Sequence, residues 1–436
     1  MKNNYWWAAA AMRAAMLLVF FALFFFSLFK ASQLRPTYHI GFSEDWLSLT
    51  LIPICLTAAI GVALAFARFT FGYFVGFYLF AMMAGYFWLN AFSTLDYDHP
   101  KALIASTVAI VAFLLPVLTI RKPLPRPDLS STWLDGVPDA VIGFAAALLI
   151  YCTLDDPHFD GLNDVETYRA AIERPKLIQY AIGNLTGALI PFSVAYAIMR
   201  DRKQIAAALC LISMMYYPVT LTKTSLMAGP FIVFMAILSS RIEPRMASIL
   251  SLLVPVAIGI ASVAGINVHH LDVVRHAIFG ILDFRLLAIP SSSLDHYFEF
   301  FNHHQLTGFC QISFLKPLMA CPYSDQLSVV FAKQYGMGNM NASLFATEGV
   351  ASVGTTWMPL SALACGFIVA IANRVSSGLP PRFILTSGAM IPITLINIPL
   401  STALLSNGFA LLMLLWWLTP ITKLEGHFDE RSDRPS

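Results

Sequence analysis

The chain has 436 residues, of which 58% are hydrophobic and only 12% are charged. Because a soluble globular domain carries about 25% charged residues, this composition excludes a soluble protein and predicts one that crosses a membrane many times. The formal net charge of +2 carries no information about partners, since in a membrane protein the sidedness of charge matters more than its sum. No nucleic-acid partner is expected. We expect membrane lipids as partners instead.

Apolar segments of bilayer-spanning length recur from one end of the chain to the other. A membrane-spanning helix needs about 17–25 apolar residues, and the sequence predicts an all-α polytopic fold with roughly 12 such helices in one integral membrane domain covering residues 1–436. The predicted spans are 7–29, 47–66, 70–92, 102–120, 137–154, 178–199, 205–221, 225–240, 246–267, 355–373, 384–401 and 404–421. The first span lacks a small-residue cleavage site and is long for a signal peptide, so we expect it to be retained.

The segments between the predicted spans differ in charge. Lys and Arg are concentrated in one alternating set of connections, whereas the other set is richer in acidic residues. Since positively charged loops stay in the cytoplasm, both termini, including the polar tail 422–436, are expected there. The two long connections, 155–177 and 268–354, are then expected on the outer side, with short helices inside them.

Five basic residues of the outer side are candidates for binding an anionic ligand. They are Arg169, Arg174, Lys223, Arg275 and Arg285. Guanidinium groups pair with phosphate oxygens through parallel hydrogen bonds, and an unpaired guanidinium among apolar neighbours, as at Arg285, is costly. Alternatives stay open for the others: Arg169 and Arg174 could pair with nearby acids on a surface helix. Lys223 could extend to the membrane surface rather than line a cavity beside proline-broken spans.

Glu348 and Asp295 are the acidic residues that could act as a general base. Glu348 lies where apolar residues resume after the 268–354 loop. An acid at that depth is a candidate functional residue, unless a neighbouring cation neutralises it. The histidines of the loop have no zinc-binding spacing, so neither a metal nor a cofactor is expected. Cys310 and Cys321 could form a disulfide if the loop faces an oxidising compartment.

Three stretches carry a resemblance to a known family. They are YRAAIERPKLIQYAIGN (168–184), LTKTSLMAGPFIVF (221–234), and RLLAIPSSSLDHYFEFF (285–301) with GNMNASLFATEGVASVG (338–354) after it. In this order they resemble the Wzy-type O-antigen polymerases, integral membrane enzymes that polymerise lipid-linked oligosaccharide repeat units. The resemblance covers residues 150–420.

The resemblance implies a metal-independent glycosyltransferase with a GT-C-like fold in the bacterial inner membrane, its two long loops being periplasmic. Donor and acceptor would both be glycans linked to undecaprenyl pyrophosphate. A Wzz-type chain-length regulator is a further implied partner.

Roles for individual residues follow from the same resemblance. Arg285, with Arg174 or Lys223, would bind the donor pyrophosphate and stabilise it as it leaves. Glu348 or Asp295 would deprotonate the acceptor hydroxyl. Asn341 and Tyr297 would orient sugars, although a place in the interfacial aromatic belt is an alternative for Tyr297.

Two other functions fit parts of the pattern. An O-antigen ligase has related architecture and typically carries a histidine in its large outer loop, where this chain has several. A repeat-unit flippase or secondary transporter would also have many spans, but such proteins are built from repeats and place charges inside the spans. In this sequence the halves differ and the charges concentrate in the loops.

Overall fold

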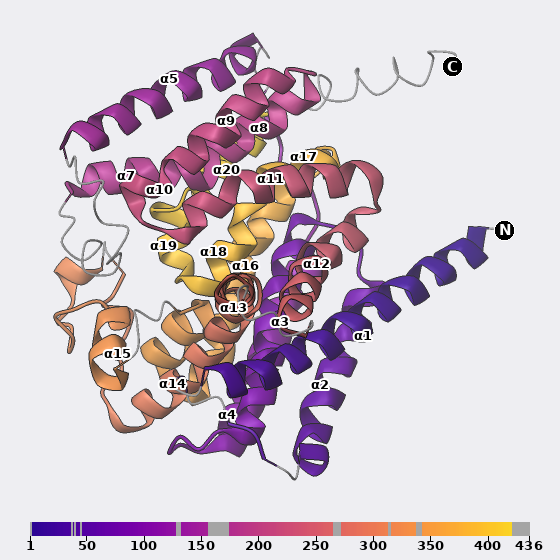
Figure 1. The fold of residues 1–436 in the computed structure, drawn as a ribbon, viewed down its shortest axis with the longest axis vertical. Coiled ribbons are helices and arrows are strands. Elements are labelled where there is room, and N and C mark those ends of the chain that lie inside the picture. Colours follow the sequence, from indigo (N-terminus) through magenta and orange to yellow (C-terminus); the bar gives the residue numbers. More distant parts are fainter. Residues whose placement is uncertain are drawn as a thin grey trace. The chain divides into compact units, whose positions relative to one another are not determined.

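The computed structural model describes residues 2–35, 38, 41–43, 46–127, 132–155, 174–264, 272–312, 315–336 and 342–420. Throughout these ranges the regular elements are helices and no strand occurs (Figure 1). This confirms the predicted all-helical class and shows a multi-pass membrane protein. The chain forms two compact units. The first contains residues 1–120, 245–371 and 395–401, and the second contains residues 121–244, 372–394 and 402–436.

The first unit is built around a central helix, α3, which is buried along nearly its whole length. Its helices are α1 (Lys2–Leu34), α2 (Trp46–Phe66), α3 (Phe71–Phe92), α4 (His99–Thr119), α12 (Pro244–Ala264), α13 (Asp272–Phe279), η5 (Gly280–Ala288), α14 (Ile289–His303), η6 (Lys316–Leu318), α15 (Leu327–Tyr335), η7 (Phe345–Ala351) and most of α16 (Ser352–Ser376). The side chain of Thr70 caps the start of α3, and that of Asp98 caps the start of α4, as short polar residues commonly do. Since α3 packs against α2, α4 and α14, the polar C-terminal end of α3 meets polar residues of α14.

The second unit has shorter and more interrupted helices. They are α5 (Thr132–Asp155), α7 (Lys176–Asn184), η3 (Leu185–Leu189), α8 (Ile190–Met199), α9 (Lys203–Met215), α10 (Tyr217–Thr220), α11 (Lys223–Arg241), α17 (Pro381–Ser387), α20 (Phe409–Leu418) and most of α18 (Met390–Asn397) and α19 (Leu400–Leu405). Within this unit, α8, α9 and α11 pack side by side (Figure 1).

The closest packing in the second unit joins two glycines to the turn between α19 and α20. A Cβ atom built on Gly183 or Gly187 would lie 2.0 or 2.1 Å from carbonyl oxygens of that turn. The Asn184 side-chain amide donates a hydrogen bond to the carbonyl of Leu405 (3.2 Å). Small residues spaced four apart allow a membrane helix to approach a neighbouring backbone this closely.

Ten helices among the described residues are long and apolar enough to cross a membrane. All but one coincide with predicted spans, and the exception is Asp272–His303, which lies inside the predicted 268–354 loop. Three predicted spans, 205–221, 384–401 and 404–421, form shorter helices instead. Pro218, Pro399 and the left-handed Gly408 (φ 78°) lie at the breaks in these segments, where proline and glycine interrupt helical hydrogen bonding. The structure therefore does not confirm the predicted number of spans.

Candidate functional site

A buried polar network surrounds Asp295 in the first unit. Asp295 is only 4% exposed, and its Oδ2 accepts a hydrogen bond from the hydroxyl of Ser93 (2.8 Å). Its Oδ1 accepts a hydrogen bond from the hydroxyl of Tyr97. Burial, together with the nearby Tyr86 and Asp295, raises the pKa of Tyr97 well above the usual tyrosine range, so Tyr97 keeps its proton and is the donor.

The network extends along the end of α3. The Asn90 amide donates to the hydroxyls of Tyr86 (3.2 Å) and Tyr97 (3.1 Å), and the His99 Nε2 contacts the carbonyl of Leu95 (3.0 Å). Because buried polar groups destabilise a fold unless they are hydrogen-bonded, these contacts stabilise the junction of α3, α4 and α14. Both oxygens of Asp295 therefore have donors, an arrangement suited to holding helices together.

The next turns of α14 are covered by α15. His296 is buried, and its Nδ1 donates to the carbonyl of Ser292 (2.8 Å). The ring of Tyr335 packs edge-on against His296, with the ring centroids 4.8 Å apart, and the Tyr335 hydroxyl donates to Glu299. Burial and the adjacent Glu299 raise the pKa of Tyr335 above the usual tyrosine range.

Glu348 lies in η7, a π-helical turn that precedes α16. Its side chain is 6% exposed. Its Oε1 accepts hydrogen bonds from both the backbone N–H and the hydroxyl of Ser401, each at 2.9 Å, and Ser401 belongs to the same unit. The other carboxylate oxygen, Oε2, is buried and accepts no hydrogen bond from the described residues. One oxygen is thus fixed by Ser401, while the other is buried without a hydrogen-bond donor among the described residues. Irregular π-helical turns of this kind are frequent at functional sites.

Tyr297 lies in the interior of the first unit. Its ring stacks on that of Phe331, with centroids 4.2 Å apart and planes 16° apart, and its side chain is 2% exposed. Its helix, α14, packs against η7, the turn that carries Glu348. In this position Tyr297 supports the turn that carries Glu348.

The predicted basic residues of the first unit have different surroundings. The side chain of Arg275 donates from Nε to the carbonyl of Ser262 (2.5 Å) and lies 3.6 Å from Asp272, so it joins α13 to the end of α12. Arg285, on the π-helix η5, is exposed. No hydrogen bond or ion pair joins its side chain to the other residues that the structure describes.

In the second unit, Arg174 approaches the turn before α11. Its Nη1 donates to the carbonyl of Val219 (2.6 Å). Three hydroxyl groups cluster in the same turn, with the oxygen of Thr222 lying 3.0 Å from that of Thr220 and 2.8 Å from that of Ser225. Lys223 is the first residue of α11.

Two further predicted residues, Arg169 and Asn341, lie outside the described residues, as do most of the 155–177 loop and the 422–436 tail.

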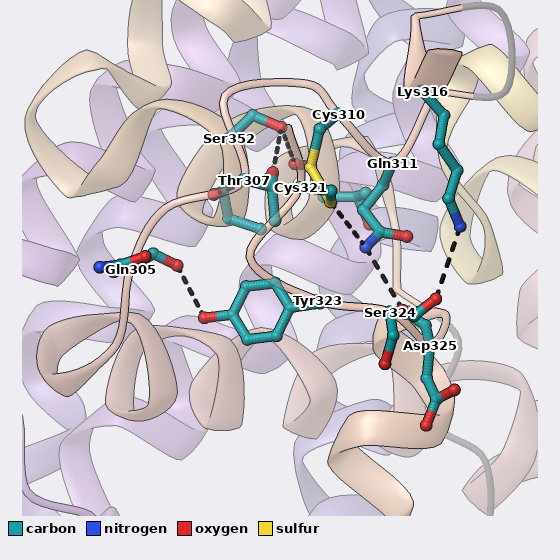
Figure 2. The surroundings of a disulfide bond; sticks show 12 residues. Gln305, Thr307, Cys310, Gln311, Lys316, Cys321, Tyr323, Ser324, Asp325 and Ser352 are labelled. Atoms are coloured by element: carbon teal, nitrogen blue, oxygen red, sulfur yellow. Dashed lines mark hydrogen bonds between the residues drawn. A yellow bond between two sulfur atoms is a disulfide. The ribbon is translucent and has the colours of Figure 1, made fainter. Parts of the chain in front are cut away.

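Cys310 and Cys321, the two cysteines that the sequence allows to pair, are joined by a disulfide (Figure 2). The bond closes the turns that lead from α14 to α15. The Gln311 side-chain amide contacts Cys321 Sγ (3.4 Å) and the carbonyl of Asp325 (3.4 Å), so both ends of the closed loop are held together.

Some residues of the site carry little sequence signal. Ser401 is one of many serines, and its relation to Glu348 depends on a contact across 53 residues.

Asp283 stands alone in an apolar stretch, which is a detectable signal. Its Oδ1 accepts a hydrogen bond from Ser27 (2.7 Å), and its Oδ2 is buried without a partner among the described residues.

Comparison of the chain with family models, with curated proteins and with solved structures gives no match.

Proposed function

We propose that this protein is a membrane glycosyltransferase that polymerises undecaprenyl-pyrophosphate-linked oligosaccharide repeat units into O-antigen or a related surface polysaccharide. The proposal begins from the resemblance of the three sequence stretches to Wzy-type polymerases. One structural observation supports it most: Glu348, the acid of the third stretch, is buried with one oxygen held by Ser401 and the other left without a donor among the described residues.

That arrangement suits a general base. Proton transfer from an acceptor hydroxyl requires a carboxylate fixed in orientation, with a lone pair free to accept the proton. Ser401 fixes Glu348 through two hydrogen bonds to a single oxygen. Asp295, the other predicted base, has a donor on each oxygen, so Glu348 is the better candidate.

The disulfide supports a location for the reaction. Disulfides form and persist in oxidising compartments, and Cys310 and Cys321 lie between Asp295 and Glu348 in the chain. We therefore infer that this part of the protein faces the periplasm, with both termini in the cytoplasm and the chain in the bacterial inner membrane.

Binding of the pyrophosphate of the donor substrate requires cationic side chains. The exposed guanidinium of Arg285 is free to pair with phosphate oxygens, whereas that of Arg275 is engaged by Ser262 and Asp272. Arg285 is accordingly the main candidate of the first unit. Arg174 and Lys223, beside the hydroxyl-rich turn of the second unit, are candidates there. A chain-length regulator of the Wzz type would be a separate protein partner of such an enzyme.

The test is the polysaccharide ladder of a strain that lacks this protein, complemented by variants. Loss of a polymerase leaves lipid A core bearing a single repeat, and wild type restores the ladder. We expect Glu348→Gln and Arg285→Ala to fail to restore it, while Lys316→Ala, which alters an exposed cation of the disulfide loop, restores it. A full ladder with Glu348→Gln would refute the role of the base. Complete polymer left on the undecaprenyl carrier would identify a ligase instead.

Transport is a second candidate because of Asp283. This acid is 1% exposed inside a candidate span, and buried acids in spans are typical of ion and substrate pathways. The same strain separates the two functions. A missing flippase leaves the core without any repeat, because repeats never reach the periplasm, whereas a missing polymerase leaves one repeat on the core.

A further inference from the structure

The segment that follows α14 is hydrogen-bonded to the turn that carries Glu348. Residues 305–310 form this segment, which we call the clamp segment. The backbone N–H of Thr307 donates to the carbonyl of Ala351 (2.8 Å), and that of Gly308 donates to the carbonyl of Ser352 (3.2 Å). The Thr307 hydroxyl also contacts the Ala351 carbonyl and the Ser352 hydroxyl, both at 3.2 Å.

These contacts lie where the helix itself is interrupted. Gly354 has φ 75° and ψ 170°, which are not helical angles. A break of this kind leaves carbonyl groups of the preceding turn without their usual N–H donors four residues on. Ala351 and Ser352 belong to that preceding turn, and the clamp segment supplies two N–H groups to them. Thr307 is 3% exposed, so water does not replace these donors.

The disulfide holds the clamp segment in place. The N–H of Cys310 donates to the carbonyl of Thr307 (3.0 Å), and the Cys310 sulfur is bonded to Cys321 (Figure 2). The Tyr323 hydroxyl donates to the carbonyl of Gln305 (2.7 Å). Both ends of the segment are therefore tied to residues 321–323, and Figure 2 shows Thr307 and Ser352 beside the disulfide.

Two steps connect the clamp segment to the backbone that carries Glu348. The Ser352 hydroxyl, which contacts Thr307, donates to the carbonyl of Thr347 (2.7 Å). Thr347 immediately precedes Glu348, and the Ser361 hydroxyl holds the Glu348 carbonyl (2.6 Å) from the following helix. The backbone on both sides of Glu348 is thus fixed by side-chain hydroxyl groups.

We propose that Thr307 is a positioning residue that, held by the Cys310–Cys321 disulfide, fixes the η7 turn and thereby the orientation of Glu348. The proposal rests on the proposed function where it concerns catalysis, but the structural part does not. Loss of the Thr307 hydroxyl removes its two contacts and leaves the backbone donors, so the turn opens more often without unfolding of the protein.

The test measures opening of the turn and polymer formation separately. The reporter is Val350→Cys, a buried position (1% exposed) beside Glu348, in a protein whose free cysteines Cys55, Cys152, Cys210 and Cys365 are replaced by alanine. The probe is N-ethylmaleimide, applied to the folded full-length protein in membranes. In this background Thr307→Val is compared with Thr307→Ser, which keeps the hydroxyl, and with the double change Cys310→Ser and Cys321→Ser.

We expect Thr307→Val to label about fivefold faster than the parent, as loss of one buried hydrogen bond allows. Thr307→Ser should label at nearly the parental rate, and the double change faster still. Polymer should fall with Thr307→Val and return with Thr307→Ser. Equal labelling of Thr307→Val and the parent would overturn the inference, whatever the polymer ladder shows. Faster labelling with an unchanged ladder would keep the structural link and remove Glu348 from catalysis. Since Thr307→Val retains the disulfide, misfolding of the double change would not affect this comparison.

Discussion

Replacement of Asp295 by alanine tests whether the acid holds helices together or performs chemistry. The change deletes the acceptor for two buried or half-buried donors, the hydroxyls of Ser93 and Tyr97. Each hydrogen bond to a carboxylate contributes about 1.5–3 kcal/mol, and a donor left unsatisfied adds to the loss. We therefore expect Asp295→Ala to lower the free energy of unfolding by about 3–6 kcal/mol, the sum for two such hydrogen bonds.

Single changes at Ser93 and Tyr97 divide this loss of unfolding free energy between the two hydrogen bonds. Ser93→Ala and Tyr97→Phe should each cost about 1–2 kcal/mol, and combining Tyr97→Phe with Asp295→Asn should cost less than the sum, because both remove the same contact. Asp96→Ala is the matched control. The Asp96 side chain is 93% exposed and lies 3.6 Å from His303, and surface pairs of this kind contribute less than about 1 kcal/mol.

Thermal unfolding of the detergent-solubilised protein, followed by gel filtration after heating, measures these differences. The ladder assay on the same variants adds the functional readout. A normal unfolding midpoint for Asp295→Ala combined with loss of polymer would refute the structural role and make Asp295 a catalytic candidate again.

Three further changes have definite expectations, each read as a thermal unfolding midpoint. Gly187→Leu should destabilise by about 1–3 kcal/mol or more through overlap with a backbone carbonyl, whereas Gly143→Leu, which meets open space, should not. Gly354→Ala should cost about 1–3 kcal/mol because φ is 75° there, unlike Gly61→Ala on α2. The pKa of Tyr335 is raised by burial, so above pH 10 the unfolded state loses this proton first and stability falls. Tyr335→Phe should reduce that alkaline loss; an unchanged pH profile would contradict the assignment.

Hydropathy alone predicts the fold class and most of the spans, because a long uninterrupted apolar run has few other solutions. It fails over Asp272–His303. The polar residues of that stretch suggest a loop, but Asp283, Asp295 and His296 are buried against other helices. Their partners, such as Ser27 and Ser93, are roughly two hundred residues away or more in the chain, and sequence pattern cannot reveal such pairings.

For the same reason, the candidate site can be predicted from the sequence only in part. Glu348 is detectable as an acid at the start of an apolar segment, but the serine that orients it is not. Tyr297 has a residue type suited both to sugar stacking and to an interfacial belt. Its stacking on Phe331 depends on how the chain returns after the disulfide, which no local pattern specifies. Arg285, by contrast, stands out in the sequence for its apolar neighbours, and those neighbours do not prevent its guanidinium from being exposed.

The glycine contact of the second unit has a consequence for biosynthesis. Asn184, between Gly183 and Gly187, binds a carbonyl 221 residues further along the chain. At the usual translation rate of about 5–20 residues per second, α7 and η3 wait roughly 10–45 seconds in the membrane before that partner is synthesised. During this interval the glycine face lacks the turn that covers it in the folded protein, and a premature stop before residue 405 would remove that turn permanently. Truncated chains of this protein should therefore be early substrates of membrane quality control.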